Sequence, residues 1–268
     1  MNLKIEDLLI FNPDEEELEK IFNELEFAAI NNNKDEKSPK KLGKYKTVLD
    51  KKDLDDWIKK IKNSKAFAID TETDSVDTVT ANLLGISISV NENEGCYIPL
   101  GHTYEDCPKQ LSMDYVIKTL GSVIEENQNK AVGQNLKFDI PILSRHGINI
   151  TNFLADTMLM SYVLNSTATR HGMDRLAEYY LNYTTTKYTD VTGTASKQIS
   201  FAEVKLDVAT NYAAEDADIT LRLFNVFSPL LKDKPVQKKL LEDLEYPLVH
   251  VLALSLIHIS EPTRRYEI

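Results

Sequence analysis

The sequence predicts an α/β protein in which helices flank a mixed sheet. Three runs with strand composition, Ala66–Thr71, Leu83–Val90 and Gly95–Leu100, lie close together, and this spacing favours an antiparallel meander. After the third run the pattern alternates between helices and short strands, which is typical of parallel pairing. The 42% hydrophobic content of the 268 residues is enough to form a buried core.

The N-terminal region predicts a helical segment over residues 1–30, followed by a linker. Asn12 and Pro13 suit the cap and the first turn of a helix that runs to Phe27, with apolar residues on one face. Residues 31–46 are polar and rich in lysine, which predicts a flexible linker and a domain boundary.

A second amphipathic helix precedes the first strand, because apolar residues from Leu54 to Ile61 repeat at helical spacing. The elements expected after the meander follow in chain order. They are a helix over Asp114–Glu126, a strand over Lys130–Gly133, a helix over Leu136–His146, a short strand near Phe153 and then mainly helix.

Charge and composition exclude several classes of protein. The 31 basic and 42 acidic side chains give a net charge of −11, which argues against a protein that coats duplex nucleic acid but permits a nuclease that grips a strand end. No run approaches the roughly 20 apolar residues of a membrane helix, so we expect a cytoplasmic protein. Cys96 and Cys107 lack the spacing of a disulfide framework or a zinc site.

Two carboxylates stand at the end of the first strand of the meander. Asp70 and Glu72 are two residues apart, and because strand side chains alternate they project from one face, while Ile69 and Thr71 point the other way. Hard divalent cations such as Mg²⁺ prefer oxygen ligands of this kind. The pair alone could equally be two surface acids beyond a strand.

Two further segments place acids on helices. Asp139 follows the expected N-cap Asn135 in GQNLKFD, where the helix dipole alone would favour an anion. Tyr212 and Asp216 lie at i and i+4, so one helical face presents a phenol beside a carboxylate. Asp218 lies off this face and is expected to be a surface acid.

The helix that carries Tyr212 should begin after Ser200, with Glu203 completing a capping box. Two unit charges about 5 Å apart repel by roughly 3 kcal/mol at an effective dielectric near 20, so four converging carboxylates would require bound cations. Spacing alone does not establish that these elements converge.

The segments FAIDTETDS, VGQNLKFD and YAAEDADIT resemble, in order and spacing, the three motifs of the proofreading 3′→5′ exonuclease domains of bacterial DNA polymerase I. These domains form part of the tyrosine subclass of the DEDD superfamily. The resemblance covers roughly Lys65 to Leu230 and implies a ribonuclease H-like fold. It also implies a phosphodiesterase that uses two divalent metal ions, Mg²⁺ or Mn²⁺, and releases deoxynucleoside 5′-monophosphates.

The resemblance assigns a role to each catalytic position. Asp70 would bridge both ions, Glu72 and Asp216 would hold the ion beside the attacking water, and Asp139 would support the other ion, largely through water. Tyr212 would orient the water together with Glu72.

The same resemblance implies which groups grip the single-stranded 3′ end of DNA. In the family, the residues just after the first motif wedge against the terminal bases. Val76 stands where leucine is usual, which makes the wedge smaller. The implied nucleic-acid contacts are Thr73, Val76, Gln134, Asn135, Phe138, Arg170 and Tyr188, with the last two nearly as well explained as a surface arginine and a loop aromatic residue.

The domain organisation implied by the resemblance is an exonuclease domain over residues 47–232 and the start of a connection to a polymerase domain over 233–253. Residues 1–30 resemble the connection to a 5′-nuclease domain, and we expect a monomer whose domains are covalently joined. The segment LSLIHISEPTR, which begins at Leu254, resembles a translated transposase adapter from sequencing-library preparation. It predicts a truncated gene with a non-native tail over Leu254–Ile268. A divergent native tail is the alternative.

Two other functions remain open from the sequence. A relative such as ribonuclease D shares the acids and trims RNA, although the TETDS and RHGMD contexts favour the polymerase branch. A non-catalytic scaffold domain is less favoured, because all four acids and the tyrosine are present.

Overall fold

A computed structural model describes residues 43–167, 169–194 and 197–259. The chain divides into two units, Met1–Pro39 and Lys40–Ile268, and all of the described residues belong to the second. The helix expected over Asn12–Phe27 and the last nine residues lie outside the described residues. None of the helices in the described part combines the length and apolar character that a membrane crossing needs.

A six-stranded mixed sheet forms the centre of this unit, with strand order β1-β4-β3-β2-β5-β6. The expected meander is confirmed, because β2–β3 and β3–β4 pair antiparallel, whereas β1–β4, β2–β5 and β5–β6 pair parallel. The strands are β1 Lys44–Thr47, β2 Phe67–Thr73, β3 Leu83–Asn91, β4 Glu94–Pro99, β5 Ala131–Gly133 and β6 Ala155–Asp156.

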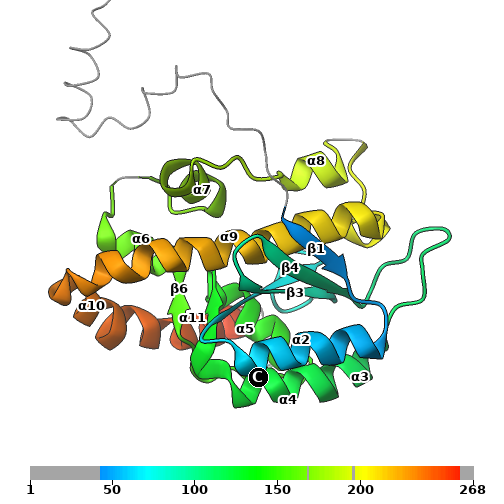
Figure 1. Cartoon of the computed structure of the whole chain (residues 1–268), viewed down its shortest axis with the longest axis horizontal. Helices are drawn as coiled ribbons and strands as arrows, with labels where there is room; N and C mark the ends of the chain where they lie inside the picture. Colours follow the sequence, from blue (N-terminus) through cyan, green and yellow to red (C-terminus); the bar gives the residue numbers. More distant parts are fainter. Residues whose placement is uncertain (1–42, 168, 195–196, 260–268) are drawn as a thin grey trace, which may run out of the picture. The chain divides into compact units, whose positions relative to one another are not determined.

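Helices follow the expected alternation and lie on both faces of the sheet (Figure 1). The α-helices are α2 Lys51–Asn63, α3 Met113–Val116, α4 Ser122–Glu126, α5 Leu136–Arg145, α6 Thr157–Leu164, α7 Met173–Leu181, α8 Tyr188–Thr192, α9 Leu206–Lys232, α10 Pro235–Leu240 and α11 Tyr246–Ile259. The π-helical segments η2 Ile117–Gly121 and η6 Leu241–Glu245 join α3 to α4 and α10 to α11, and the 3₁₀ turns are η3 Gln128–Lys130 and η5 Phe201–Glu203.

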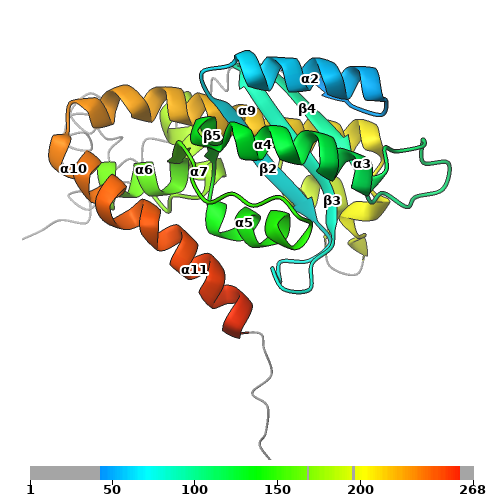
Figure 2. The ribbon, with the colours of Figure 1, turned by 90° about the horizontal axis from the view of Figure 1, so that it is seen from below.

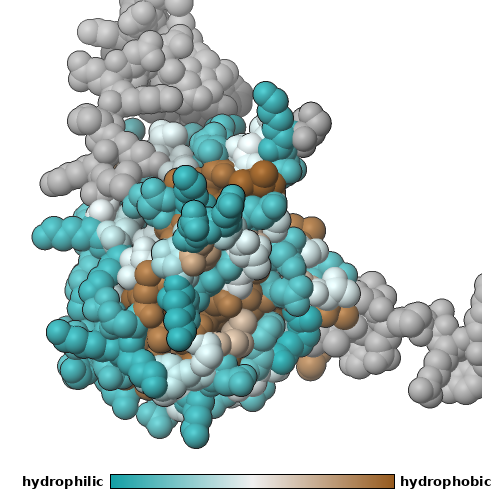
Figure 3. All heavy atoms as spheres, turned by 90° about the vertical axis from the view of Figure 1, so that its right-hand side faces the viewer, coloured by the Kyte–Doolittle hydropathy of each residue, from teal (hydrophilic) through white to brown (hydrophobic). Residues whose placement is uncertain are grey.

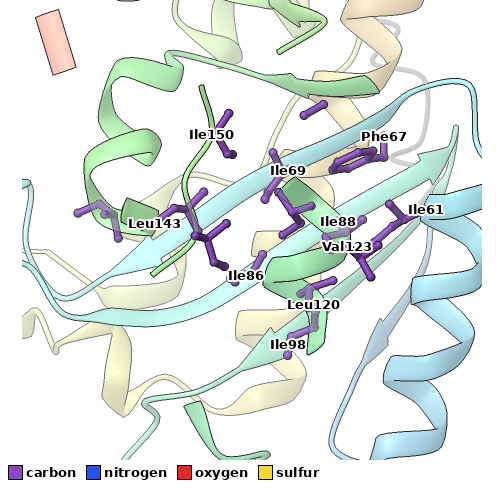
Figure 4. Close-up of a cluster of buried hydrophobic side chains, with 14 of the residues drawn as sticks. Ile61, Phe67, Ile69, Ile86, Ile88, Ile98, Leu120, Val123, Leu143 and Ile150 are labelled. Atoms are coloured by element: carbon purple, nitrogen blue, oxygen red, sulfur yellow. The ribbon is translucent and has the colours of Figure 1, made fainter. Parts of the chain in front are cut away.

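The main hydrophobic core lies between one face of the sheet and helices α2, α4 and α5 (Figure 4). Phe67 and Ile69 of β2 point into it, and α2 contributes Leu54, Trp57 and Ile61, all of them buried. Burying a side chain of this size stabilises the fold by about 1.5–3 kcal/mol. This core therefore fixes the face of β2 that is turned away from Asp70 and Glu72.

Helix α9 covers the opposite face of the sheet, where it contacts β1, β2, β3 and β4. Small residues let the helix approach closely, and Ala68 of β2 packs against Ala217. At Gly95 of β4 a β-carbon would lie 2.8 Å from the backbone oxygen of Ala214, so this approach requires glycine. The close fit brings the middle of α9 next to the end of β2.

Helix α11 packs against α5 and extends the main core through Val249 and Ala253 (Figure 2). The helical backbone continues to Ile259, past Ala253, where the non-native tail was expected to start. A continuous helix is compatible with either origin of this segment, so the tail stays a prediction.

Strand β1 overlaps the linker that was expected over residues 31–46, so that expectation is wrong for Lys44–Lys46. The four residues KYKT contain no apolar run and pair with β4, which lies some fifty residues further along the chain. Tyr45 and Thr47 are half-buried and bond to α9, through Asp218 and Thr210 respectively. These distant partners, and not local hydrophobicity, make the segment a strand.

Candidate active site

Three carboxylates from two elements meet where β2 ends beneath α9. Asp70 and Glu72 leave β2 on the face turned toward α9, and Asp216 comes from α9 itself. Each of the three offers an oxygen within 4.8 Å of the oxygens offered by the other two. Glu72 and Asp216 are buried and Asp70 is half-buried.

This crowding makes the charged forms of the three acids unfavourable. Burial, followed by the charge of Asp216, raises the pKa of Asp70 well above its usual range. Burial and the neighbouring charges of Asp70 and Asp139 do the same to the pKa of Glu72, and burial and Glu72 raise the pKa of Asp216. Groups with similarly raised pKa values cluster at functional sites.

The oxygen Oε1 of Glu72 is buried and has no hydrogen-bond partner among the described residues. A buried carboxylate oxygen without a donor is costly and calls for an explanation such as an ion. The set offers only oxygen ligands, which hard divalent cations prefer. The residues present therefore fit a divalent metal.

Asp139 is buried in the first turn of α5 and is held by Thr71 of β2. Its Oδ1 accepts from the backbone N–H of Thr71 at 3.1 Å and from the Thr71 hydroxyl at 2.6 Å. Burial and the charge of Asp70 raise the pKa of Asp139, while the bonds from Thr71 lower it. The side chain of Thr71, which points away from Asp70 and Glu72, thus anchors the fourth acid, a role that the sequence did not signal.

Tyr212 lies one turn before Asp216 on α9, as the spacing predicts. Burial raises the pKa of its phenol, and the charges of Asp216, Glu72 and Asp70 raise it further. The ring packs 5.7 Å from that of Phe201 and 6.2 Å from that of Tyr188, measured between centroids. Phe201, fully buried in the 3₁₀ turn before α9, is a supporting residue that the sequence analysis did not identify.

The capping box expected at Ser200 and Glu203 is confirmed, and it caps η5. The helix that bears Tyr212 begins a few residues later, at Leu206.

The residues expected to contact nucleic acid beside Asp139 are half-buried. Asn135 stands at the N-cap position of α5 in a left-handed conformation with φ of 70°, but its side chain makes no capping bond. Gln134 donates through Nε2 to the backbone oxygen of His171 at 2.9 Å and accepts from Thr157. These bonds tie Gln134 to the segment that carries Arg170, whose side chain is exposed.

Of the other residues expected to contact nucleic acid, Val76 and Tyr188 are exposed and Thr73 is half-buried. Val76 is 91% exposed, and Thr73 donates to the backbone oxygen of Ser75 at 2.8 Å. Tyr188, 39% exposed, stacks on Phe201 with ring planes 17° apart. Figure 3 shows apolar surface gathered in the middle of one side of the molecule and framed by hydrophilic side chains.

Asp218 was expected to be a surface acid, and this expectation is wrong. Its side chain is fully buried, with Oδ2 accepting from the Tyr45 hydroxyl at 2.9 Å and Oδ1 from the backbone N–H of Asn93 at 2.7 Å. Helix α9 is covered on more than one side, so a residue that points away from the acid cluster still lies in the interior.

Comparison with known families identifies this arrangement. A family model described as 3′-5′ exonuclease matches residues 45–232, which is most of the described chain. The chain belongs to the 3′→5′ exonuclease family. The matched region includes Asp70, Glu72, Asp139, Tyr212 and Asp216, and its bounds lie within two residues of the domain expected over 47–232.

The exonuclease is similar to bacterial polymerases. It is 38% identical over 267 residues to DNA polymerase I of Pseudomonas aeruginosa, covering 94% of this chain and 29% of that protein. It is 42% identical over 212 residues to DNA polymerase I of Borreliella burgdorferi, covering 78% of this chain and 22% of that protein. The chain therefore spans less than a third of these relatives.

A solved structure supports the ribonuclease H-like fold. Brucella melitensis NrnC matches with a TM-score of 0.56 at 17% identity, covering 85% of this chain and 100% of that chain. At this identity the likeness concerns the fold alone.

Proposed function

We propose that this exonuclease removes nucleotides from the 3′ end of single-stranded or frayed DNA. It hydrolyses the terminal phosphodiester and releases deoxynucleoside 5′-monophosphates, with two divalent cations bound, Mg²⁺ or Mn²⁺. The observation that carries the proposal is the cluster of Asp70, Glu72 and Asp216, whose ligand oxygens lie within 4.8 Å of one another. Carboxylates this close are stable in their charged form only with cations between them.

Asp70, Glu72 and Asp216 would hold the cations, and Asp139 would support one of them from the start of α5. Bound divalent cations would lower the pKa of the attacking water and stabilise the leaving 3′ oxygen. The raised pKa of Tyr212 keeps the proton on its phenol, so the hydroxyl can donate a hydrogen bond. Tyr212 and Glu72 would orient the water for attack in line with the leaving oxygen.

DNA as the substrate is supported by the relatives, which are DNA polymerases of bacteria. Tyr188 offers a partly exposed ring on which an unpaired base could stack, and Val76 offers an exposed apolar side chain. Because the matched relatives are more than three times longer, we propose that the activity proofreads for covalently joined polymerase and 5′-nuclease domains.

The test uses the chain with 5′-labelled single-stranded DNA and RNA of one sequence, in Mg²⁺ and in EDTA. We expect a ladder on DNA that shortens from the 3′ end and disappears with EDTA. Asp139→Ala should abolish the ladder, because it removes the acid that Thr71 anchors. Asp218→Asn is the control, since Asp218 is a buried acid that Tyr45 and Asn93 hold and that has no proposed part in metal binding.

A chain that shortens RNA much better than DNA would move the assignment to an RNA-trimming activity of the ribonuclease D kind. No shortening of either polymer under any divalent metal would defeat the enzymatic proposal and leave a scaffold domain. Equal losses in Asp139→Ala and Asp218→Asn would show that the assay reports folding and not the site.

A further inference from the structure

One buried carboxylate outside the acid cluster joins the starts of two helices. Asp156 ends β6 and is 1% exposed. Its Oδ1 accepts from the backbone N–H groups of Asn135 at 3.2 Å, Met158 at 3.0 Å and Leu159 at 3.3 Å. Its Oδ2 accepts from the N–H of Leu136 at 2.8 Å.

Half of this arrangement is an ordinary helix cap. Asp156 is the N-cap residue of α6, and the bonds from Met158 and Leu159 are those of any Asp in that position. Asn, Ser or Asp at an N-cap stabilises a helix to a similar degree. A cap for α6 therefore does not require a carboxylate in particular.

The other half serves α5, whose own cap residue does not act as one. Asn135 occupies the N-cap position, but its side chain makes no capping bond. The first N–H groups of a helix lack partners within it and need an external acceptor. For Asn135 and Leu136 that acceptor is Asp156, from an element twenty residues further along the chain.

The start of α5 matters to the site because Asp139 lies in this first turn. Leu136 is held by Asp156, and three residues later Asp139 is held by Thr71. The carboxylate of Asp139 is thus placed from two sides, by β2 through Thr71 and by β6 through the helix start. A metal ligand is oriented by the groups that hold it, and loss of such groups typically costs about 10–100-fold in metal affinity or activity.

We propose that Asp156 is a positioning residue for the exonuclease: it locks the start of α5 to β6 and so sets Asp139 for the metal. This rests on the proposed function, in which Asp139 supports a divalent cation. Both carboxylate oxygens of Asp156 accept from backbone N–H groups, so in this proposal Asp156 contacts neither the cations nor the DNA. Its contribution is to the affinity for metal and not to the chemical step.

Two substitutions distinguish the role of Asp156 at the start of α5 from its role as the cap of α6. Asp156→Asn keeps the shape and the oxygen that serves Met158, Leu159 and Asn135, but it turns an NH₂ group toward the N–H of Leu136. Asp156→Ser keeps a good cap for α6 and is too short to reach Leu136 as well. Asp50→Asn is the matched control, because Asp50 caps α2 by accepting from Asp53, and α2 carries none of the site acids.

The first measurement is hydrogen–deuterium exchange in EDTA, which reads the helices without metal or substrate. In both Asp156 variants we expect the amides at the start of α5 to exchange at least about tenfold faster, because Leu136 loses its acceptor. Amides of α6 should stay within about threefold of wild type, since a cap remains. Asp50→Asn should leave both helices unchanged.

The second measurement is the affinity for Mn²⁺ alone, by titration calorimetry without nucleic acid. We expect the Asp156 variants to bind at least about tenfold more weakly. The Mg²⁺ concentration that half-saturates DNA hydrolysis should rise by the same factor, while the rate at saturating Mg²⁺ stays within a few-fold of wild type. Asp50→Asn should show neither shift.

Faster exchange at α5 with unchanged Mn²⁺ affinity would overturn the proposal, and so would unchanged exchange at α5. A rate that stays low at saturating Mg²⁺ would also overturn it, by showing an effect on chemistry or folding. If Asp156→Asn fails to fold, Asp156→Ser decides the question. A wild-type chain that binds Mn²⁺ but hydrolyses no DNA would defeat the proposed substrate, and the exchange and calorimetry would still decide the role of Asp156.

Discussion

Helix α9 carries neighbouring buried acids that meet opposite surroundings. Glu215 accepts from the Tyr183 hydroxyl at 2.7 Å and from the N–H of Thr186 at 2.6 Å, and Asp218 is likewise held by two donors. Asp216, between them, faces other carboxylates. Within four residues the same helix thus contains two acids held by donors from other segments and one acid, Asp216, that faces carboxylates and has Tyr212 of its own helix beside it.

The difference shows that burial alone does not separate structural from functional acids. A buried carboxylate with its own donors costs little and ties segments together, as Asp218 ties β1 and the β3–β4 turn to α9. A buried carboxylate set against others, with Glu72 Oε1 lacking a partner among the described residues, destabilises the metal-free fold. That cost is expected where a cation binds.

The largest effect should separate Asp216→Asn from Asp218→Asn. We expect Asp216→Asn to lower kcat/KM on single-stranded DNA by about a thousandfold, about 4 kcal/mol of transition-state stabilisation, because a cation loses a charged ligand. Asp218→Asn keeps one acceptor oxygen and should stay within about threefold. Steady-state rates in Mg²⁺ measure both, and comparable losses in the two variants would show that the comparison is false.

The second effect concerns stability against pH without metal. The pKa values of Asp70, Glu72 and Asp216 are raised in the folded state, so the folded chain holds protons that the unfolded chain releases near pH 4. Their contribution is fully present below about pH 4 and is lost as the pH rises through the raised values. In EDTA, the unfolding free energy of wild type should therefore fall relative to that of Asp216→Asn as the pH rises above about 4.

At pH 8 in EDTA, the unfolding free energy of Asp216→Asn should exceed that of wild type by about 1–2 kcal/mol, because one repelling charge is gone. Mg²⁺ should reverse this order by stabilising wild type more than the variant. Denaturant melts at several pH values give both quantities. A variant less stable than wild type in EDTA at pH 8 would mean that the bonds of Asp216 within the protein outweigh its repulsion by the neighbouring carboxylates.

Periodicity in the sequence predicted most of this fold, because the strands and helices around the site have strong local patterns. The meander and the helices α2, α5 and α9 follow from apolar alternation and spacing. Strand β1 could not be predicted in this way, since KYKT becomes a strand only through pairing with β4 and bonds to α9.

The site, like the fold, has features that the sequence predicted and features that depend on distant contacts. The sequence motifs made Asp70, Glu72 and Asp216 candidates and the family resemblance joined them, and the structure brings these three together. The anchor of Asp139 was not predictable, because Thr71 was expected only to point away from the pair. Asp218 was misassigned because a helical wheel indicates which residues share a face and not which faces are covered.

The third effect tests Tyr212, the tyrosine beside the acid cluster. We expect Tyr212→Phe to lower kcat by about 10–100-fold, because the hydroxyl that would orient the water is lost while the cations keep their ligands. The ring remains packed against Phe201, so the melting temperature should change little. Single-turnover rates measure the chemical step, and a variant with wild-type rates would remove Tyr212 from the mechanism.

The smallest effect tests Tyr45, the tyrosine that donates to Asp218, and the expected changes in rate and stability are the reverse of those for Tyr212→Phe. Tyr45→Phe removes the hydroxyl that donates to Asp218 and leaves one oxygen of a buried carboxylate without that donor. We expect a loss of about 1–2 kcal/mol of unfolding free energy, with kcat within about twofold of wild type. Denaturant melts and single-turnover rates on the two phenylalanine variants give the opposite pattern if the comparison holds. A loss of rate in Tyr45→Phe without a loss of stability would place Asp218 in the reaction. It would show that Asp218 does not depend on the Tyr45 hydroxyl for stability and acts in catalysis, as Asp70 and Glu72 are proposed to do.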